Sequence, residues 1–86
     1  MPGISRKSAD SAGGVISEGS SDVFVENNGV AREGDIVVTH GKAPHVMPTL
    51  VGKSSDVFVN GKGVVRAGDP ATCGHAATGS STVNAN

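Results

Sequence analysis

Short apolar triplets separated by polar turn residues give this chain its pattern. Val23, Phe24 and Val25 form one triplet, and residues 57–59 repeat it as Val-Phe-Val. β-branched and aromatic residues in runs of this kind favour strands. No segment keeps apolar residues at a period of about 3.6 over the length of an ordinary helix. The pattern therefore predicts an all-β fold.

Turn residues follow each triplet and predict a hairpin. Residues 27–29 are Asn-Asn-Gly and residues 60–63 are Asn-Gly-Lys-Gly. Residues of these types supply the positive φ angles of tight turns. We expect return strands at residues 30–32 and 64–66, each of which ends in a second turn at Gly-Asp. The predicted unit is strand, tight turn, strand, turn.

The same unit occurs more than once. Residues 20–35 and 54–69 begin 34 residues apart and are identical at 11 of 16 positions, and a decayed third copy covers residues 80–86. Repetition at a fixed spacing indicates one supersecondary unit used several times, with the copies packed on each other. We predict one domain over residues 1–86, built of repeated short β-hairpins.

The core available to such a domain is small. The sequence holds two Phe, one Leu and three Ile, with no Trp or Tyr, so thirteen Val must form most of the core. Domains with so little core usually need a disulfide, a metal or a partner. Cys73 is the only cysteine, which excludes a disulfide within the chain.

The histidines and the cysteine fall in two places, each after the end of a repeat. His40 and His45 follow the first repeat, and Cys73 and His75 follow the second. Superposed repeats would bring the two loops together, where the four side chains could complete a tetrahedral site for one structural Zn²⁺ per chain. Cys73 and His75 would lie on one side of an extended segment. On spacing alone, four ordinary loop residues remain an alternative.

Composition and charge argue against several functions. With a net charge of −1 and scattered Lys and Arg, the chain has no basic field for nucleic acid. It has no apolar run of about 18 residues for a transmembrane helix and no secretory signal at Met1, so we expect synthesis in the cytoplasm. No carboxylates form an acid/base pair, and the chain is short for a substrate pocket, so we expect neither catalytic residues nor a small-molecule substrate. A small zinc-dependent enzyme and a β-rich binding module are the alternatives.

A longer frame surrounds the second repeat. Residues 54–62 follow S-x-x-V-F-V-N-G-K, and residues 66–75 continue as R-x-G-D-x-x-x-C-G-H. The chain opens with Gly-Ile-Ser-Arg at residues 3–6 and has Ala-Gly-Gly-Val-Ile at residues 12–16. Together these segments resemble the PAAR-repeat family over essentially the whole chain. The Pro-Ala-Ala-Arg motif itself is degenerate, as Gly-Val-Ala-Arg at residues 29–32 and Gly-Val-Val-Arg in the second repeat.

The resemblance implies a fold and a function. It implies a small cone with a metal-pinned vertex that caps the homotrimeric β-helical spike of a contractile injection machine, with one tip per trimer. Similar proteins of this family occur in type VI secretion systems and in phage contractile tail baseplates. There they sharpen the spike for puncture of the target cell envelope. We expect a bare tip, without an appended toxin or adaptor domain, of the kind assembled into a virion tail.

The resemblance also implies a zinc ion near the vertex. Cys73 and His75 match the terminal part of that site, and His40 and His45 would supply the rest. Many members carry His before the first Gly-Gly, where this chain has Ala12. Because Ala12 cannot bind a metal, the ligand set must shift to the middle loop.

The alternation along the strands makes both of their faces apolar. Phe24 faces away from its flanking valines, and Phe58 does the same in the second repeat. Either both faces belong to the core, or one face presents Phe24 and Phe58 to a partner. The third copy has Asn84 at the equivalent position.

Four aspartates recur at equivalent points of the two repeats. We expect Asp35 and Asp69 to be solvated turn charges, with a turn-pinning role through backbone N–H groups as the alternative. We expect Asp22 and Asp56 to do similar work in their own turns.

Overall fold

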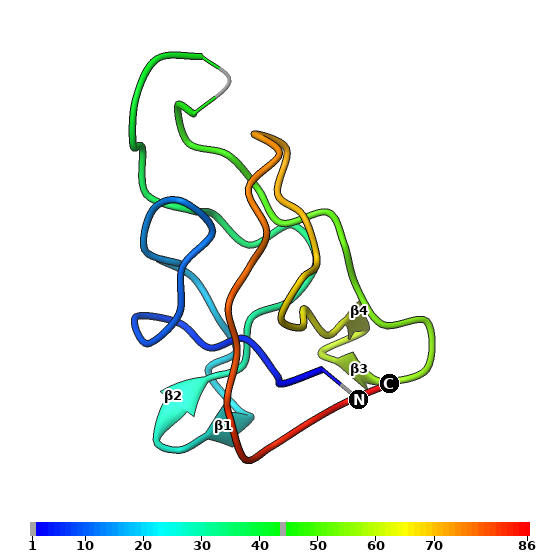
Figure 1. The fold of residues 1–86 in the computed structure, drawn as a ribbon. Coiled ribbons are helices and arrows are strands. Elements are labelled where there is room, and N and C mark those ends of the chain that lie inside the picture. Colours follow the sequence, from blue (N-terminus) through cyan, green and yellow to red (C-terminus); the bar gives the residue numbers. More distant parts are fainter. Residues whose placement is uncertain (1, 44) are drawn as a thin grey trace.

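Two β-hairpins form the regular strand pairs of the computed structural model, which describes residues 2–43 and 45–86. β1 (Phe24–Val25) pairs antiparallel with β2 (Asn28–Gly29), and β3 (Phe58–Val59) pairs antiparallel with β4 (Lys62–Gly63) (Figure 1).

The first hairpin turns earlier than the sequence predicts. Its turn residues are Glu26 and Asn27, at φ angles of 53° and 71°, where residues 27–29 were expected. These two residues take the left-handed conformation that a two-residue turn of this hand requires, even though neither is a glycine. Asn28 and Gly29 therefore already belong to the return strand, so the strand predicted at residues 30–32 begins two residues too late.

Three segments with the pattern Gly-x-x-Arg form a closed ring at the centre of the fold. They are residues 3–6, 29–32 and 63–66. Ala31 donates its backbone N–H to Ser5 at 2.9 Å, Val65 donates to Ala31 at 3.0 Å, and Ser5 donates to Val65 at 2.9 Å. Each segment pairs with the next and the third returns to the first, so the ring presents no unpaired strand edge.

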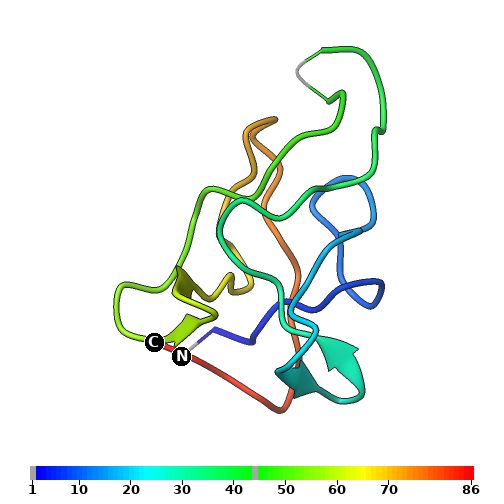
Figure 2. The ribbon, with the colours of Figure 1, turned by 180° about the vertical axis from the view of Figure 1, so that it is seen from behind.

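The third hairpin is divided between the two ends of the chain. Gly3 pairs with Asn84 just as Gly29 pairs with Phe24 in the first hairpin. Residues 2–6 and 80–86 run side by side in both ribbon views (Figures 1 and 2), joined by the hydrogen bond from Ile4 N–H to the Val83 carbonyl. We infer that residues 3–6 supply the return strand that the decayed copy at residues 80–86 lacks.

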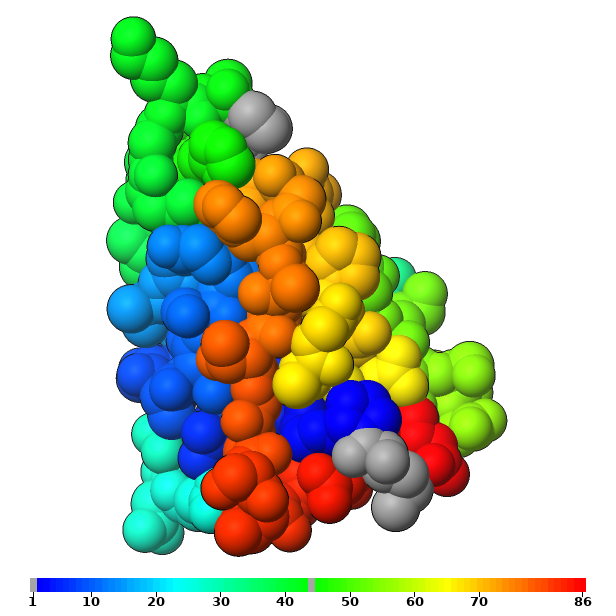
Figure 3. All heavy atoms as spheres, viewed as in Figure 1, coloured from blue at the N-terminus to red at the C-terminus, as the bar shows by residue number. Residues whose placement is uncertain are grey.

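The molecule tapers from a broad end to a narrow one (Figure 3). We call the broad end, with both hairpins and residues 80–86, the base, and the narrow end, with residues 38–43, 45–47 and 72–75, the vertex. The prediction of a small conical all-β fold is confirmed. In the described part of the chain no helix is long and apolar enough to cross a membrane.

Two apolar layers fill the cone. The layer near the base contains Ile4, Val25, Val30, Val59, Val64 and Ala85. The layer toward the vertex contains Ala12, Ile16, Ala31, Val37, Leu50, Val65, Ala71 and Ala77. Apart from Leu50, both layers consist of small and β-branched side chains, and all three copies contribute to them, as the valine-rich composition requires.

The expectation that Asp35 and Asp69 are solvated is wrong. The Asp35 side chain is 3% exposed and accepts hydrogen bonds from the Arg32 backbone N–H at 2.7 Å and from two nitrogens of the Arg32 guanidinium. Asp69 binds Arg66 in the same way, and Asp10 binds Arg6 in the third copy. The carboxylate raises the pKa of each arginine, chiefly through the hydrogen bond. The alternative, a turn-pinning role through backbone N–H groups, therefore describes these aspartates.

Serines, and not Asp22 and Asp56 as expected, accept the backbone hydrogen bonds that order these turns. Ser20 Oγ accepts the backbone N–H groups of Asp22 and Val23 at 3.0 and 2.9 Å. Ser54 and Ser80 repeat this pattern in the other copies. The buried hydroxyl, and not the exposed carboxylate, orders the turn before each outer strand.

Hydrogen bonds from each hairpin turn also link neighbouring copies. Glu26 accepts hydrogen bonds from Ser80, Thr82 and Arg6, which hold its pKa below the ordinary value, with the hydroxyl of Ser80 as the largest cause. Asn60 accepts from Ser20 of the first copy in the equivalent way. The three copies are therefore joined at the base by side chains as well as by the central ring.

Two kinds of glycine position should respond differently to alanine. A Cβ on Gly29 would lie 2.4 Å from the Ser20 carbonyl oxygen, and one on Gly63 would lie 2.7 Å from that of Ser54. Gly34 and Gly68 have φ angles of +89° and +93°, with open space around them. We expect Gly29→Ala and Gly63→Ala to cost about 2–3 kcal/mol through overpacking. Gly34→Ala and Gly68→Ala should cost about 1 kcal/mol through backbone strain.

Denaturant unfolding of the four variants measures these costs. Lys42→Ala and Lys53→Ala are the controls and should be nearly neutral, because the Lys53 pair with Glu33 is exposed on both sides. Harmless substitutions at Gly34 and Gly68 would show that these turns do not need a left-handed residue.

Candidate metal centre

Three loops of unequal length meet at the vertex. Ala12, Val37 and Ala71 are equivalent, because each donates its backbone N–H across its own loop. The acceptors are the carbonyls of Gly14, Pro48 and His75. The first loop therefore contains Gly13 alone, the second contains residues 38–47, and the third contains residues 72–74. Only the second and third loops are long enough to bring side chains to the axis.

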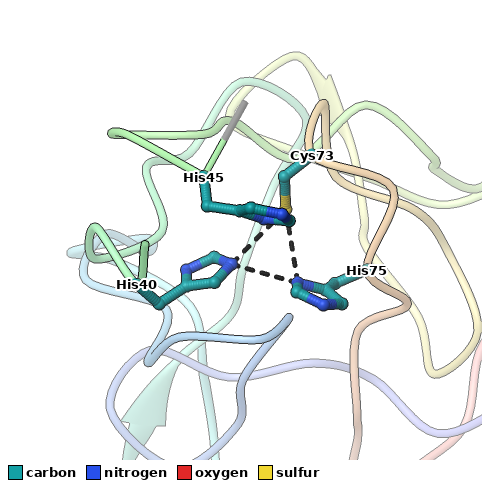
Figure 4. A group of neighbouring side chains, drawn as sticks. All are labelled: His40, His45, Cys73 and His75. Atoms are coloured by element: carbon teal, nitrogen blue, oxygen red, sulfur yellow. Dashed lines mark hydrogen bonds between the residues drawn. The ribbon is translucent and has the colours of Figure 1, made fainter. Parts of the chain in front are cut away.

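Three side chains from these two loops and that of His75, which closes the third loop, converge on one point (Figure 4). Candidate ligand atoms of His40, His45, Cys73 and His75 all lie within 4.8 Å of one another. His40 Nε2 and His75 Nδ1 are 3.0 Å apart, and Cys73 Sγ is 3.6 Å from each. The three imidazole centroids are separated by 4.9–5.0 Å. The structure thus brings together the four side chains singled out from the sequence.

The separations among His40, Cys73 and His75 fit a tetrahedral metal ion. A Zn²⁺ ion with Zn–N of about 2.0–2.1 Å and Zn–S of about 2.3 Å would place two nitrogens roughly 3.3 Å apart and nitrogen and sulfur roughly 3.6 Å apart. The sulfur distances agree with these values, and the nitrogen pair is slightly closer. Four protein donors fill a tetrahedral shell and leave no position for water.

Protonation of the ligand atoms also suits a metal. His40 Nδ1 lies 2.8 Å from the Val38 carbonyl oxygen, and a carbonyl can only accept. Nδ1 therefore carries the proton, and the lone pair on Nε2 faces the other three side chains. In the described part of the chain His45 Nδ1 is buried without a hydrogen-bond partner. A buried polar atom of this kind requires an explanation, and a bound cation would supply one.

Gly13 and Gly14 form a wall of the site that the sequence did not reveal. A Cβ on Gly13 would lie 2.0 Å from His75 Nδ1 and 2.6 Å from His40 Nε2. A Cβ on Gly14 would lie 2.4 Å from the Val38 carbonyl oxygen. The Gly-Gly pair was visible in the sequence, but its role depends on a contact between segments far apart in the chain. With Ala12 fully buried in the core, the first loop contributes space and no ligand.

The segment that carries Cys73 and His75 is not extended, contrary to expectation. Gly74 has a φ angle of 89° and donates its N–H to the Ala71 carbonyl at 2.9 Å, which makes a tight turn. Because the loop curls, both side chains still point to the same place (Figure 4).

Phe24 and Phe58 lie in the base, at the other end of the molecule from this cluster. Each is 57% exposed, whereas Val25 and Val59 beside them are buried. The alternative that both strand faces belong to the core is therefore wrong. A partner-binding role for the two phenylalanines stays a prediction.

Comparison with known proteins agrees with the geometry. A family model described as the PAAR motif matches residues 7–78, which include both hairpins and the whole His-Cys cluster. A search of curated protein sequences gave no significant match. The matched range leaves out residues 3–6 and 80–86, the two segments that complete the third copy.

Proposed function

Because this chain belongs to the PAAR-motif family, we propose that it is the tip of the central spike of a contractile injection machine. PAAR motifs occur in spike-tip proteins of such machines, and the family is structural and not catalytic. The observation that carries the proposal is the base, where one chain presents three equivalent hairpins around a closed ring. In this proposal residues 1–86 act as one domain.

The base suits a partner with three-fold symmetry. Phe24, Phe58 and Asn84 occupy equivalent places, since each pairs with the glycine of a Gly-x-x-Arg segment. Exposed Val23 and Val83 extend this apolar surface, and contiguous apolar surface on a small protein marks an interface. A single chain with three similar elements can offer each subunit of a homotrimer a similar contact. The partner we propose is therefore a homotrimeric β-helical spike, with one tip per trimer.

A groove in the base and the open end of a β-helix both support docking of the base on the spike. An open groove of ≈400 Å³ has Phe24, Lys7 and Asn28 in its lining, so it could receive a side chain of the spike. A β-helix also ends in unpaired strand edges, which promote aggregation unless they are covered. A cap that binds through its own hairpins would cover them.

At the vertex we propose one structural Zn²⁺ per chain, held by His40, His45, Cys73 and His75. When bound, the ion would cross-link the two long loops and add no catalytic step. Gly13 would leave space for the ligands, and the Val38 carbonyl would orient His40. A cross-linked vertex would keep its shape under load while the spike punctures the target cell envelope.

The proposed path is synthesis in the cytoplasm, followed by assembly into a phage tail baseplate or a type VI secretion spike and delivery to the target envelope. No nucleic acid or small-molecule substrate is involved. The base determines the spike to which the tip binds, and the vertex meets the envelope.

Native mass spectrometry of the purified tip with its cognate spike tests the partner. The expected complex contains one tip and three spike chains. Phe24→Ser and Phe58→Ser should each weaken binding about tenfold or more, as central aromatic contacts usually do. Asn84→Phe should strengthen it, because the third position would then match the other two.

The matched control is Met47→Asn, because Met47 is 58% exposed but lies at the vertex, so this change should leave spike binding unchanged. A complex with three tips per trimer would contradict a single cap. An equal loss of spike binding in Met47→Asn would contradict the base as the binding surface.

A further inference from the structure

The part of the cone nearest the vertex contains almost no charged residues. Residues 11–16, 36–43, 45–50 and 70–77 run from the pinned Asp turns to the vertex loops, and we call these segments the vertex half (Figure 1). All eight Asp and Glu residues and six of the seven Lys and Arg residues lie outside them. Lys42 is the single charged residue of the vertex half.

The same half exposes several large apolar side chains. Val15, Val38, Val46 and Met47 are 49%, 46%, 55% and 58% exposed. Their segments are neighbours, since Val38 donates its N–H to the Val15 carbonyl and Met47 donates its N–H to the Thr39 hydroxyl. None of the four belongs to the apolar layers or to the His-Cys cluster, so neither packing nor metal binding explains their exposure.

We propose that the vertex half inserts shallowly into an anionic phospholipid bilayer, led by Val46 and Met47 with Lys42 among the lipid phosphates. Exposed apolar side chains gain free energy when they leave water for the boundary between headgroups and acyl chains. Carboxylates would oppose this step, because anionic lipids repel them and their desolvation is costly. A basic residue near the surface favours it.

The base lacks this combination, although it also exposes large apolar side chains, Phe24 and Phe58. Phe24 is flanked by Asp22 and Glu26, and Phe58 follows Asp56. Lys7 and Lys62 also lie near these phenylalanines, but outside the vertex half eight Asp and Glu residues stand against six Lys and Arg. An anionic surface is therefore less favourable for the base, which suits a protein partner instead. The two exposed apolar surfaces of the cone thus differ in the charge around them, and this difference assigns the lipid to the vertex. The inference rests on the proposed function for the outward orientation of the vertex.

Flotation of the isolated tip with lipid vesicles tests the inference without the spike. Wild-type protein should float with vesicles of phosphatidylglycerol mixed with phosphatidylcholine. The double variant Val46→Ser, Met47→Asn should lower the partition coefficient roughly tenfold, and asparagine suits the φ angle of 46° at Met47. Lys42→Gln should lower binding to the mixed vesicles about fivefold and leave binding to pure phosphatidylcholine unchanged.

Two matched controls remove similar apolar surface elsewhere. Val51→Ser changes a valine that is 46% exposed, like Val38, and Phe58→Ser changes a side chain that is as exposed as Met47. Both should bind vesicles as the wild type does. Metal content and thermal unfolding of each variant show whether it is folded.

Lack of flotation of the wild type, full binding by the double variant, or an equal loss in Phe58→Ser would each overturn the inference. Spike binding of the same proteins separates it from the proposed function. The vertex double variant should form the normal complex with the spike, whereas Phe58→Ser should not. Failure of the wild type to bind the spike would contradict the cap and leave the vesicle result intact.

Discussion

Cys73→Ser should abolish metal binding and destabilise the protein by on the order of 5 kcal/mol, because binding of a structural zinc contributes directly to the free energy of folding. The apolar layer toward the vertex is built largely from alanine and valine, so the long loop between Val37 and Pro48 has little else to hold it. Elemental analysis of native protein should give one zinc per chain. Chelation of the wild type should reproduce the unfolding curve of Cys73→Ser, and chelation of the variant should change nothing further.

Gly13→Ala offers a sharper test of the same site, because it changes no ligand. Its Cβ would occupy the space of His75 Nδ1 and His40 Nε2, and its φ angle of +85° adds backbone strain. Gly34→Ala is the matched control, since its φ angle is +89° but nothing lies within 4 Å of the added atom. Both variants should be strained, and only Gly13→Ala should lose the metal. Undiminished stability of a metal-free wild type would contradict a structural ion.

The sequence predicts the two hairpins because nearly the same residues occur twice at a fixed spacing. It predicts a decayed third copy at residues 80–86 but not how that hairpin is completed, because its two halves lie at opposite ends of the chain. These halves share only Gly3, Arg6, Ser80, Ser81 and Val83 with both other copies. Only the hydrogen bonds of the closed ring identify residues 3–6 as the missing strand. A similarity divided between termini has no fixed spacing, and fixed spacing was the signal that revealed the first two copies.

The candidate metal site likewise has one part that the sequence predicts and one part that it does not. The four His and Cys residues could be selected from the sequence because few other side chains bind a soft metal through nitrogen or sulfur. The role of Gly13 could not, because it consists of the space left beside His75, which is 62 positions away in the sequence. The burial of Asp35 was missed for a related reason, since an aspartate after a glycine is usually an exposed turn residue. Here the backbone N–H and the guanidinium of Arg32 bind its carboxylate.

The aspartate that is most buried in these turns leads to the last prediction. Asp35→Asn should destabilise the protein by about 3 kcal/mol, because removing one partner of a buried pair leaves the other charge without compensation. Asn retains one oxygen for the Arg32 backbone N–H, so the loss reports mainly on the guanidinium. Asp69→Asn should cost less, since the Asp69 side chain is 15% exposed compared with 3% for Asp35.

Glu33→Gln is the control for this series, because Glu33 pairs with Lys53 at 3.3 Å while its side chain is 44% exposed. An exposed pair of this kind contributes about 0.5 kcal/mol or less. Denaturant unfolding at one pH, with metal saturated throughout, gives the three values on one scale. The expected order of destabilisation is Asp35→Asn, then Asp69→Asn, then Glu33→Gln. If Asp35→Asn were as mild as Glu33→Gln, the buried carboxylates would not be what fixes the Arg-x-Gly-Asp turns, and backbone hydrogen bonds of the central ring would have to hold them alone.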